Sequence, residues 1–128
     1  GGKQLRPNLN ITDMVRAYHV FLEARAAKVD REAFNVGFQN RSVEDIAILV
    51  RQTLADPTIE LEYTPSDDNR SYHVNSDKIK RVLGFEGKFT IEDAIRSIAE
   101  AYRAGKISDP FKNTKYSNIK RMQELRVK

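Results

Sequence analysis

The sequence predicts a small mixed α/β fold. The length of 128 residues suits one domain, and the hydrophobic share of 40% and charged share of 31% are typical of globular chains. Segments with apolar residues at helical spacing alternate with short apolar runs bounded by turn residues. The predicted order is strand, helix, strand, helix, strand, short helix, helix. Strands this short usually join a larger sheet, so we do not expect these strands to form a complete sheet alone.

The first predicted elements are a short strand and an amphipathic helix. Residues 8–11 follow Pro7 and have an extended pattern. Thr12 is a candidate helix cap, and Asp13 is then favourably placed in the first turn. A helix is predicted over residues 13–26, because its apolar side chains recur at helical spacing and form one face. These are Met14, Val15, Tyr18, Phe21 and Leu22.

The middle of the chain predicts two strands on either side of a helix. Residues 33–36 form an apolar run that is typical of a short buried strand. Ser42, with Asp45 three residues later, resembles a capping box and predicts a helix start. Apolar and polar residues alternate over residues 59–63, which indicates a half-buried strand. Residues 65–69 are a loop by composition. The helix between the two strands has one apolar face, made of Val43, Ile46, Ala47, Val50 and Leu54.

The last predicted elements are two helices. An extended piece at residues 71–74 leads to a short helix that Gly84 ends. The clearest helix of the chain begins at Thr90 and Asp93 and ends at Gly105. The remaining tail is polar, basic and weakly periodic. We therefore expect a lobe over residues 1–105 and a basic tail over residues 106–128.

Composition excludes several classes of function. The net charge of +4 arises in the tail, where seven Lys and Arg face two acidic residues. Basic residues are not gathered on a folded face, so we expect no nucleic-acid partner. No apolar stretch approaches the roughly 18 residues of a membrane span, so no membrane partner is expected. The chain has no cysteine, which excludes disulfides and is compatible with a cytoplasmic location. His19 and His73 lack partners at ligand spacing, so no metal site is expected.

Four sequence blocks within residues 2–105 carry recognisable motifs. They are residues 2–17 (GKQLRPNLNITDMVRA), FNVG at 34–37 with SVEDI at 42–46, DNRSY at 68–72 with SDKI at 76–79 and LGF at 83–85, and TIEDAI at 90–95. In this order they resemble the C-terminal, substrate-binding part of the extended short-chain dehydrogenase/reductase family of NAD-dependent nucleotide-sugar epimerases and dehydratases. The chain departs from the family pattern at Asn10, Thr12, Phe38 and Glu86-Gly87.

The resemblance implies a small mixed α+β substrate-binding lobe that lacks the Rossmann domain. It implies a nucleotide-sugar substrate, NAD or NADP in the parent protein, a missing N-terminal Rossmann lobe as partner, and a homo-oligomer. The chain contains no glycine-rich nucleotide loop, and no tyrosine is followed four residues later by lysine. We therefore expect this fragment to bind no cofactor, to be inactive alone, and to associate with itself or with the missing lobe.

The best candidate site residues are two arginines. Family resemblance places Arg6 and Arg70 against the nucleotide diphosphate or the nearby ribose, and the planar guanidinium suits phosphate oxygens. Asn35 is a third substrate-binding candidate, although a structural role for its amide is favoured. For Asp68 an ion pair or a turn is favoured over acid/base chemistry, and for Tyr72 a core position is favoured. No catalytic, cofactor-binding or metal-binding residue is identified.

Two alternatives remain open. The chain can be a non-catalytic interaction module whose basic tail binds an acidic protein, a membrane surface or nucleic acid. It can also be a family member that regulates or scaffolds and has lost catalysis.

Overall fold

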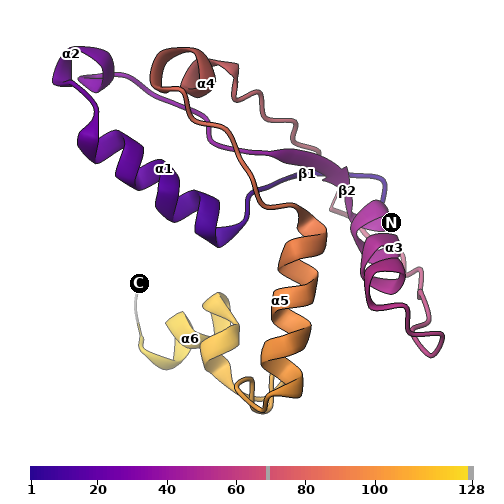
Figure 1. Cartoon of the computed structure of the whole chain (residues 1–128). Coiled ribbons are helices and arrows are strands. Elements are labelled where there is room, and N and C mark those ends of the chain that lie inside the picture. Colours follow the sequence, from indigo (N-terminus) through magenta and orange to yellow (C-terminus); the bar gives the residue numbers. More distant parts are fainter. Residues whose placement is uncertain (69, 127–128) are drawn as a thin grey trace. The chain divides into compact units, whose positions relative to one another are not determined.

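The computed structural model describes residues 1–68 and 70–126, so Asn69 of the third motif block and Lys128 of the tail lie outside the described residues. The chain divides into two compact units, Gly1–Arg96 (unit 1) and Ser97–Lys128 (unit 2). The element order is β1, α1, α2, β2, α3, α4, α5, a 3-10 turn and α6 (Figure 1). The predicted small mixed fold is confirmed. The predicted boundary after residue 105 stays a prediction.

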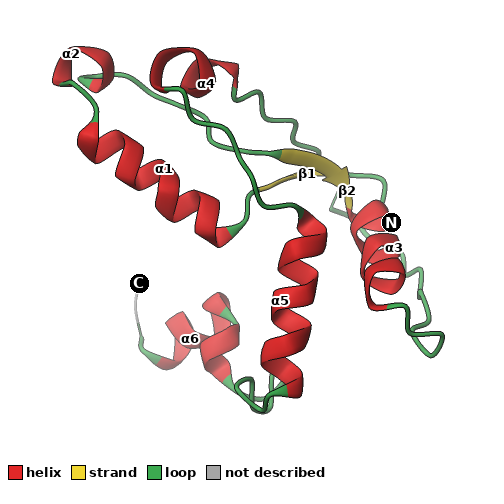
Figure 2. Cartoon of the chain, viewed as in Figure 1, coloured by secondary structure: helices red, strands yellow, loops and turns green. Residues whose placement is uncertain are grey.

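A two-stranded antiparallel sheet lies at the centre of unit 1 (Figure 2). Strand β1 (Leu5–Asn8) pairs with β2 (Gln39–Ser42). The strand predicted at residues 8–11 therefore lies earlier in the chain, and the strands predicted at 33–36 and 59–63 are wrong. Apolar runs favour extended backbone, but a strand also needs a partner at ladder distance, and β1 gives that partner to residues 39–42.

Helix α1 (Ile11–Glu23) begins two residues earlier than predicted. Its cap is Asn10, whose side-chain oxygen accepts a hydrogen bond from the Thr12 backbone N–H at 2.9 Å. The prediction that Thr12 is the cap is therefore wrong. The predicted helix at 13–26 is interrupted after α1, and a single helical turn, α2 (Ala26–Val29), follows.

The other helices begin and end where local signals predicted. Helix α3 (Val43–Leu54) starts with the predicted capping box, in which Ser42 and Asp45 bond each other's backbone N–H. Helix α4 (Asp77–Leu83) ends at Gly84, and the chain turns at Gly105 soon after α5 (Ile91–Arg103). Both glycines have a φ of 68°, a left-handed conformation that glycine adopts without strain.

The core of unit 1 packs one face of α1 against α4 and the segment after it. Ala17, Ile79 and Phe85 are its buried apolar residues. The rings of Phe21 and Phe34 meet edge to face with centroids 5.4 Å apart. Partly buried side chains complete the core, and they are Val20, Phe21, Phe34, Val36 and Leu83. The apolar face predicted for the first helix is therefore only partly buried, because Val15, Tyr18 and Leu22 are exposed.

One carboxylate is fully buried in this core. The Asp13 side chain, 0% exposed, accepts hydrogen bonds from the backbone N–H groups of Lys88 and Phe89 at 2.8 and 2.9 Å. Its other oxygen accepts a hydrogen bond from Arg16, and the Arg16 guanidinium lies 5.5 Å from the ring centroid of Phe85. Since a buried charge is tolerated only when paired, these contacts fix α1 to residues 85–89.

Unit 2 contains structure that the tail's weak periodicity did not predict. A 3-10 turn (Thr114–Tyr116) follows a side-chain cap by Asn113, and α6 (Asn118–Glu124) comes next. The C-terminal half of α5 also belongs to this unit. Within residues 1–68 and 70–126, the structure has no helix whose length and apolar character would suffice to span a bilayer.

Phe38 and Gly87, two positions at which the chain departs from the family pattern, contact each other. A Cβ atom placed on Gly87 would lie 2.5 Å from Cγ of Phe38, far inside van der Waals distance. The Phe38 ring therefore occupies the space that a side chain at position 87 would need. The large residue at 38 and the glycine at 87 form a matched pair.

We expect Gly87→Ala to destabilise the chain by roughly 1–3 kcal/mol, because the new methyl group overpacks the site. Adding Gly87→Ala to Phe38→Ala should cost much less, since the ring that clashes is gone. Chemical denaturation of the four members of this double-mutant cycle measures the coupling. Additive effects of the two changes would contradict the contact.

Candidate functional site

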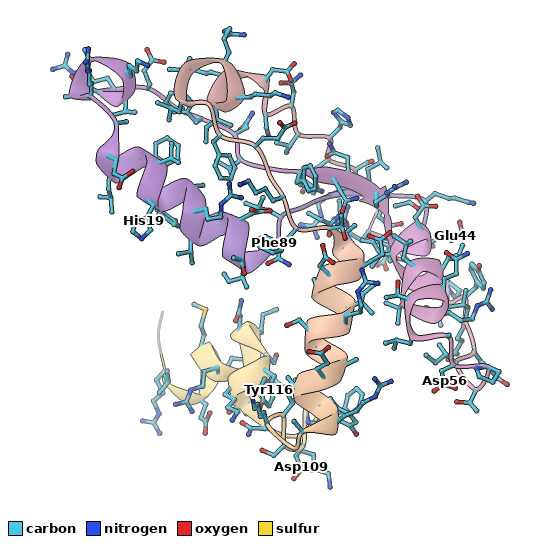
Figure 3. All side chains as sticks on the ribbon, in the orientation of Figure 1. His19, Glu44, Asp56, Phe89, Asp109 and Tyr116 are labelled. Atoms are coloured by element: carbon cyan, nitrogen blue, oxygen red, sulfur yellow. The ribbon has the colours of Figure 1, made fainter. Side chains whose placement is uncertain are left out.

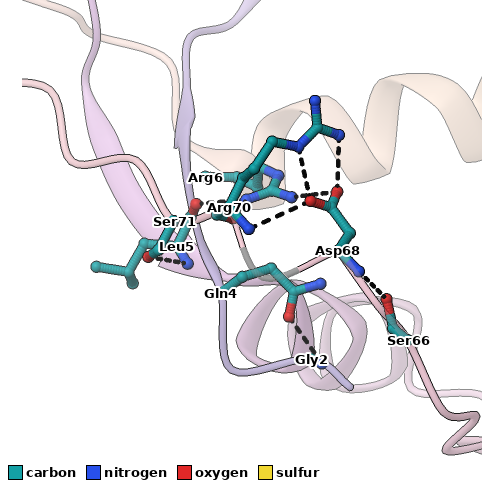
Figure 4. A network of polar contacts seen from close by, with 8 residues as sticks. All are labelled: Gly2, Gln4, Leu5, Arg6, Ser66, Asp68, Arg70 and Ser71. Carbon is teal, nitrogen blue, oxygen red and sulfur yellow. Dashed lines mark hydrogen bonds and ion pairs between the residues drawn. The ribbon is translucent and has the colours of Figure 1, made fainter.

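Arg6 and Arg70 converge on one carboxylate (Figure 4). Arg70 holds Asp68 with two hydrogen bonds, from Nε to Oδ1 at 2.7 Å and from Nη2 to Oδ2 at 3.0 Å. Arg6 donates from Nη2 to the same Oδ2 at 3.0 Å. Arg6 Nη1 also donates to the backbone carbonyl of Arg70 at 2.6 Å. Two of the three substrate-binding residues predicted from sequence are thus brought together.

The network joins two segments that are distant in the chain. Arg6 lies on β1, whose position is fixed by pairing with β2. The segment that carries Arg70 is held beside β1 by two hydrogen bonds, from the Leu5 N–H to Ser71 Oγ at 3.0 Å and from the Tyr72 N–H to the Leu5 carbonyl at 3.1 Å. Ser71 and Tyr72, at the start of the piece expected to be extended, therefore lie beside the first strand, and Val74 bonds the Asn40 side chain on β2.

Tyr72 is part of this site and not of the core. Its side chain is 47% exposed, so the predicted core position is wrong. The Arg6 guanidinium lies 5.5 Å from the centroid of the Tyr72 ring, within cation–π range. The ring therefore limits the positions open to the guanidinium. One sequence signal could have found Tyr72. It lies only two residues after Arg70, and an extended backbone keeps both residues close to the same strand.

The network of Arg6, Asp68 and Arg70 has more positive than negative charge. Hydrogen bonds from Arg70 lower the pKa of Asp68 to about 2, so this carboxyl is ionised at neutral pH, and Asp68 in turn raises the pKa of Arg70. One carboxylate faces two guanidinium groups, which leaves a surplus positive charge. The Arg70 side chain is 72% exposed, and Figure 4 shows its second terminal nitrogen directed away from Asp68. That edge is accessible to a second anion.

A hollow of about 420 Å³ adjoins the network. Its lining includes Gln4 and Ser66, and the Ser66 hydroxyl accepts a hydrogen bond from the Asp68 N–H at 3.2 Å. Glu44, labelled in Figure 3, lines the hollow and pairs with Lys3 at 2.6 Å. Hydrogen bonds from Lys3 and then from Tyr63 lower the pKa of Glu44. The hollow is therefore lined by residues of both chain segments, with Glu44, Glu60 and Glu62 among them.

The other polar candidates lie outside this network. Asn35 is exposed, and it does not end a strand as predicted. Asn8 Nδ2 donates to the backbone carbonyls of Arg6 and Gln39, at 2.8 and 3.3 Å, so it has a structural role at the sheet. His19 is an exposed residue of α1 (Figure 3). Among the residues that the structure describes, no three His, Cys, Asp or Glu side chains gather as a metal site would require.

The chain is similar in sequence to a curated enzyme and in fold to solved structures. No family model matches the chain. The chain is 31% identical, over 115 residues, to a dTDP-glucose 4,6-dehydratase from Shigella flexneri. The aligned region covers 80% of this chain and 30% of the relative. A solved UDP-glucose 4-epimerase with UDP-glucose, from Thermotoga maritima, has a TM-score of 0.67 at 23% identity over 83% of this chain and 34% of its own. An L-threonine dehydrogenase from Cupriavidus necator has a TM-score of 0.68 at 16% identity, over 80% and 38%.

The chain resembles part of an extended short-chain dehydrogenase/reductase. The two solved structures are under 25% identical and show the fold alone, while the curated relative shows the likeness in sequence. The chain spans about a third of the length of each of these proteins. The predicted resemblance to this family, and to only part of its members' length, is confirmed.

The residues described here do not fit the nicotinamide cofactor that such a reductase uses. A dinucleotide site of this family needs several glycines between a strand and the helix that follows it. In the described part of the chain, Gly84 and Gly105 instead stop helices, and Gly87 accommodates the Phe38 ring. No step is therefore assigned to a cofactor within this chain.

The Asp68 carboxyl should titrate near pH 2 and not near its usual value of 3.8, because Arg70 and Arg6 favour its charged form. Because the folded pKa is the lower one, the ion pair stabilises the fold above about pH 3.8, and this contribution is lost as pH falls toward 2. Carboxyl-carbon NMR titration measures the midpoint. Arg70→Ala should raise it, and Arg81→Ala, which removes an equal charge from α4, should not. An unchanged midpoint in Arg70→Ala would contradict the network.

Proposed function

We propose that this chain is the nucleotide-sugar-binding portion of an NAD-dependent epimerase or dehydratase that acts on an NDP-sugar, and that it is inactive alone. The observation that carries the proposal is the pair of arginines that share the carboxylate of Asp68, whose backbone N–H bonds Ser66 in the lining of a neighbouring hollow. The sequence likeness to a dTDP-glucose 4,6-dehydratase supports the substrate class. In this proposal NAD or NADP belongs to a lobe outside these residues.

The arginines are proposed to hold the diphosphate. A guanidinium presents donors in a planar fork that matches two phosphate oxygens, and charge-assisted hydrogen bonds of this type are among the stronger ones. Asp68 and the backbone fix both side chains before a ligand arrives, which reduces the entropy lost on binding. Asn35, whose side chain is exposed, is the third proposed substrate contact. Binding energy gathered at the nucleotide end then orients the sugar.

The partner of the lobe is proposed to be the missing Rossmann domain. Four apolar residues of α1 recur at positions i, i+4, i+7 and i+11, and all are exposed: Ile11 at 75%, Val15 at 52%, Tyr18 at 64% and Leu22 at 84%. This stripe lies apart from the face of α1 that carries Ala17 and packs in the core. Such a stripe supports packing against another folded part, either the Rossmann lobe or a second copy in a homo-oligomer. Light scattering across a range of concentrations distinguishes self-association from a stable monomer.

UDP- and dTDP-sugars should raise the melting temperature of the chain, since a ligand that binds only the folded state stabilises it. Arg70→Ala should weaken this binding by roughly tenfold, because one charge-assisted contact to the diphosphate is lost. Thermal-shift titration gives both affinities.

The matched control is Arg81→Ala, which removes the same charge from the exposed surface of α4. It should bind the nucleotide sugar as the unchanged chain does. Absence of any shift with nucleotide sugars, or equal weakening in the two variants, would contradict the proposed function.

A further inference from the structure

Unit 2 carries a concentration of exposed apolar side chains. On α5, Ile98 and Tyr102 are 62% and 59% exposed, and Phe111 is 91% exposed in the loop that follows. Helix α6 and its C-cap residue Leu125 add apolar side chains at spacings of three residues, where Ile119 is 72%, Met122 48% and Leu125 56% exposed. Exposed apolar side chains in this concentration favour an interaction site, because their burial is favourable.

The same unit has an excess of positive charge. Residues 97–126 contain seven Lys and Arg and three acidic residues. One of the three acids is occupied within the unit, since Glu124 accepts from the Thr114 hydroxyl at 2.6 Å and from Arg121 at 2.7 Å. The bases follow the apolar residues closely in the chain, as at Phe111-Lys112 and Ile119-Lys120.

Two of the exposed aromatic side chains of this region line a hollow of about 590 Å³. Tyr102 and Phe111 line it, together with Arg103, Ile107 and Lys112. Asp109, labelled in Figure 3, also lines the hollow. Its backbone carbonyl accepts hydrogen bonds from the N–H groups of Lys112 and Asn113 at 3.0 and 2.8 Å. The hollow can receive one apolar side chain, and the cationic side chains of Arg103 and Lys112 lie in its lining.

We propose that unit 2 is a docking surface for an acidic amphipathic segment of another protein. An apolar side chain of that segment enters the hollow beside Phe111, further apolar side chains cover the Ile119, Met122 and Leu125 face, and its carboxylates pair with the surrounding Lys and Arg. Charge complementarity sets the sign of the partner, and the apolar surface supplies the greater part of the affinity.

The exposed aliphatic side chains of Ile119, Met122 and Leu125 favour an acidic protein segment over a nucleic acid as the partner. A nucleic acid binds through phosphates and stacked bases and leaves aliphatic side chains uncovered. The ring of Tyr116 already has the Lys115 ammonium over it, 4.8 Å from its centroid. This inference does not depend on the nucleotide-sugar function, because it uses residues of unit 2 only.

The test uses a short labelled peptide in which Glu and Leu recur at helical spacing, with fluorescence anisotropy as the readout. We expect a dissociation constant on the order of ten micromolar, in the range of small transient interfaces, and weaker binding at high salt. Two control peptides carry Lys in place of Glu, or Gln in place of Leu. A single-stranded oligonucleotide and phosphatidylserine vesicles test the other classes of partner.

Ile119→Glu should weaken binding of the acidic peptide by about tenfold or more, because it puts a like charge and a polar group on the proposed face. Ala27→Glu makes the same charge change at an exposed residue of α2 (Ala26–Val29), outside every proposed binding surface, and should leave the affinity unchanged. Equal binding of either control peptide, tighter binding to the oligonucleotide or vesicles, or loss in Ala27→Glu instead of Ile119→Glu would overturn the proposal.

Discussion

The buried carboxylate of Asp13 is the interaction on which the arrangement of unit 1 depends. It is fully excluded from solvent, and it joins α1 to the backbone of Lys88 and Phe89. Removing an ionised group from water is costly, so the fold that buries it must supply two backbone donors and Arg16 together. This requirement selects one packing of α1 on the segment that leads to α5. Arg16 extends the constraint to Phe85 in the apolar core.

The candidate site follows from that packing. β1 precedes α1 by only two residues, so fixing α1 also limits where β1 and its Arg6 lie. Pairing with β2 sets the direction of β1, and its backbone then holds Ser71 and Tyr72. Arg70 reaches the site through these contacts, although it is far from Arg6 in sequence. Arg6 is thus positioned by a strand of the sheet, whereas the segment that carries Arg70 is held by individual hydrogen bonds to that strand.

Local signals in the sequence were sufficient to place α3, α4 and α5, but not the cap and end of α1 or the helix α6. The Ser42–Asp45 box and the glycines after α4 and α5 act within one turn of chain, so a pattern over a few residues predicts them. The strands were wrong at residues 33–36 and 59–63 because pairing depends on a distant segment. For the same reason, the sequence placed Asp13 only in a helix turn and did not predict its burial. The match of Phe38 with Gly87 is likewise visible only in three dimensions.

The resemblance to extended short-chain dehydrogenases named Arg6 and Arg70, and the structure brings the two side chains to one carboxylate. The central claim is that this arrangement receives the diphosphate of a nucleotide sugar. Amide NMR of the ¹⁵N-labelled chain during titration with dTDP-glucose tests it most directly. The account predicts saturable shifts gathered at Leu5, Arg6, Arg70 and Tyr72. Absence of shifts, or shifts confined to residues 97–126, would contradict it.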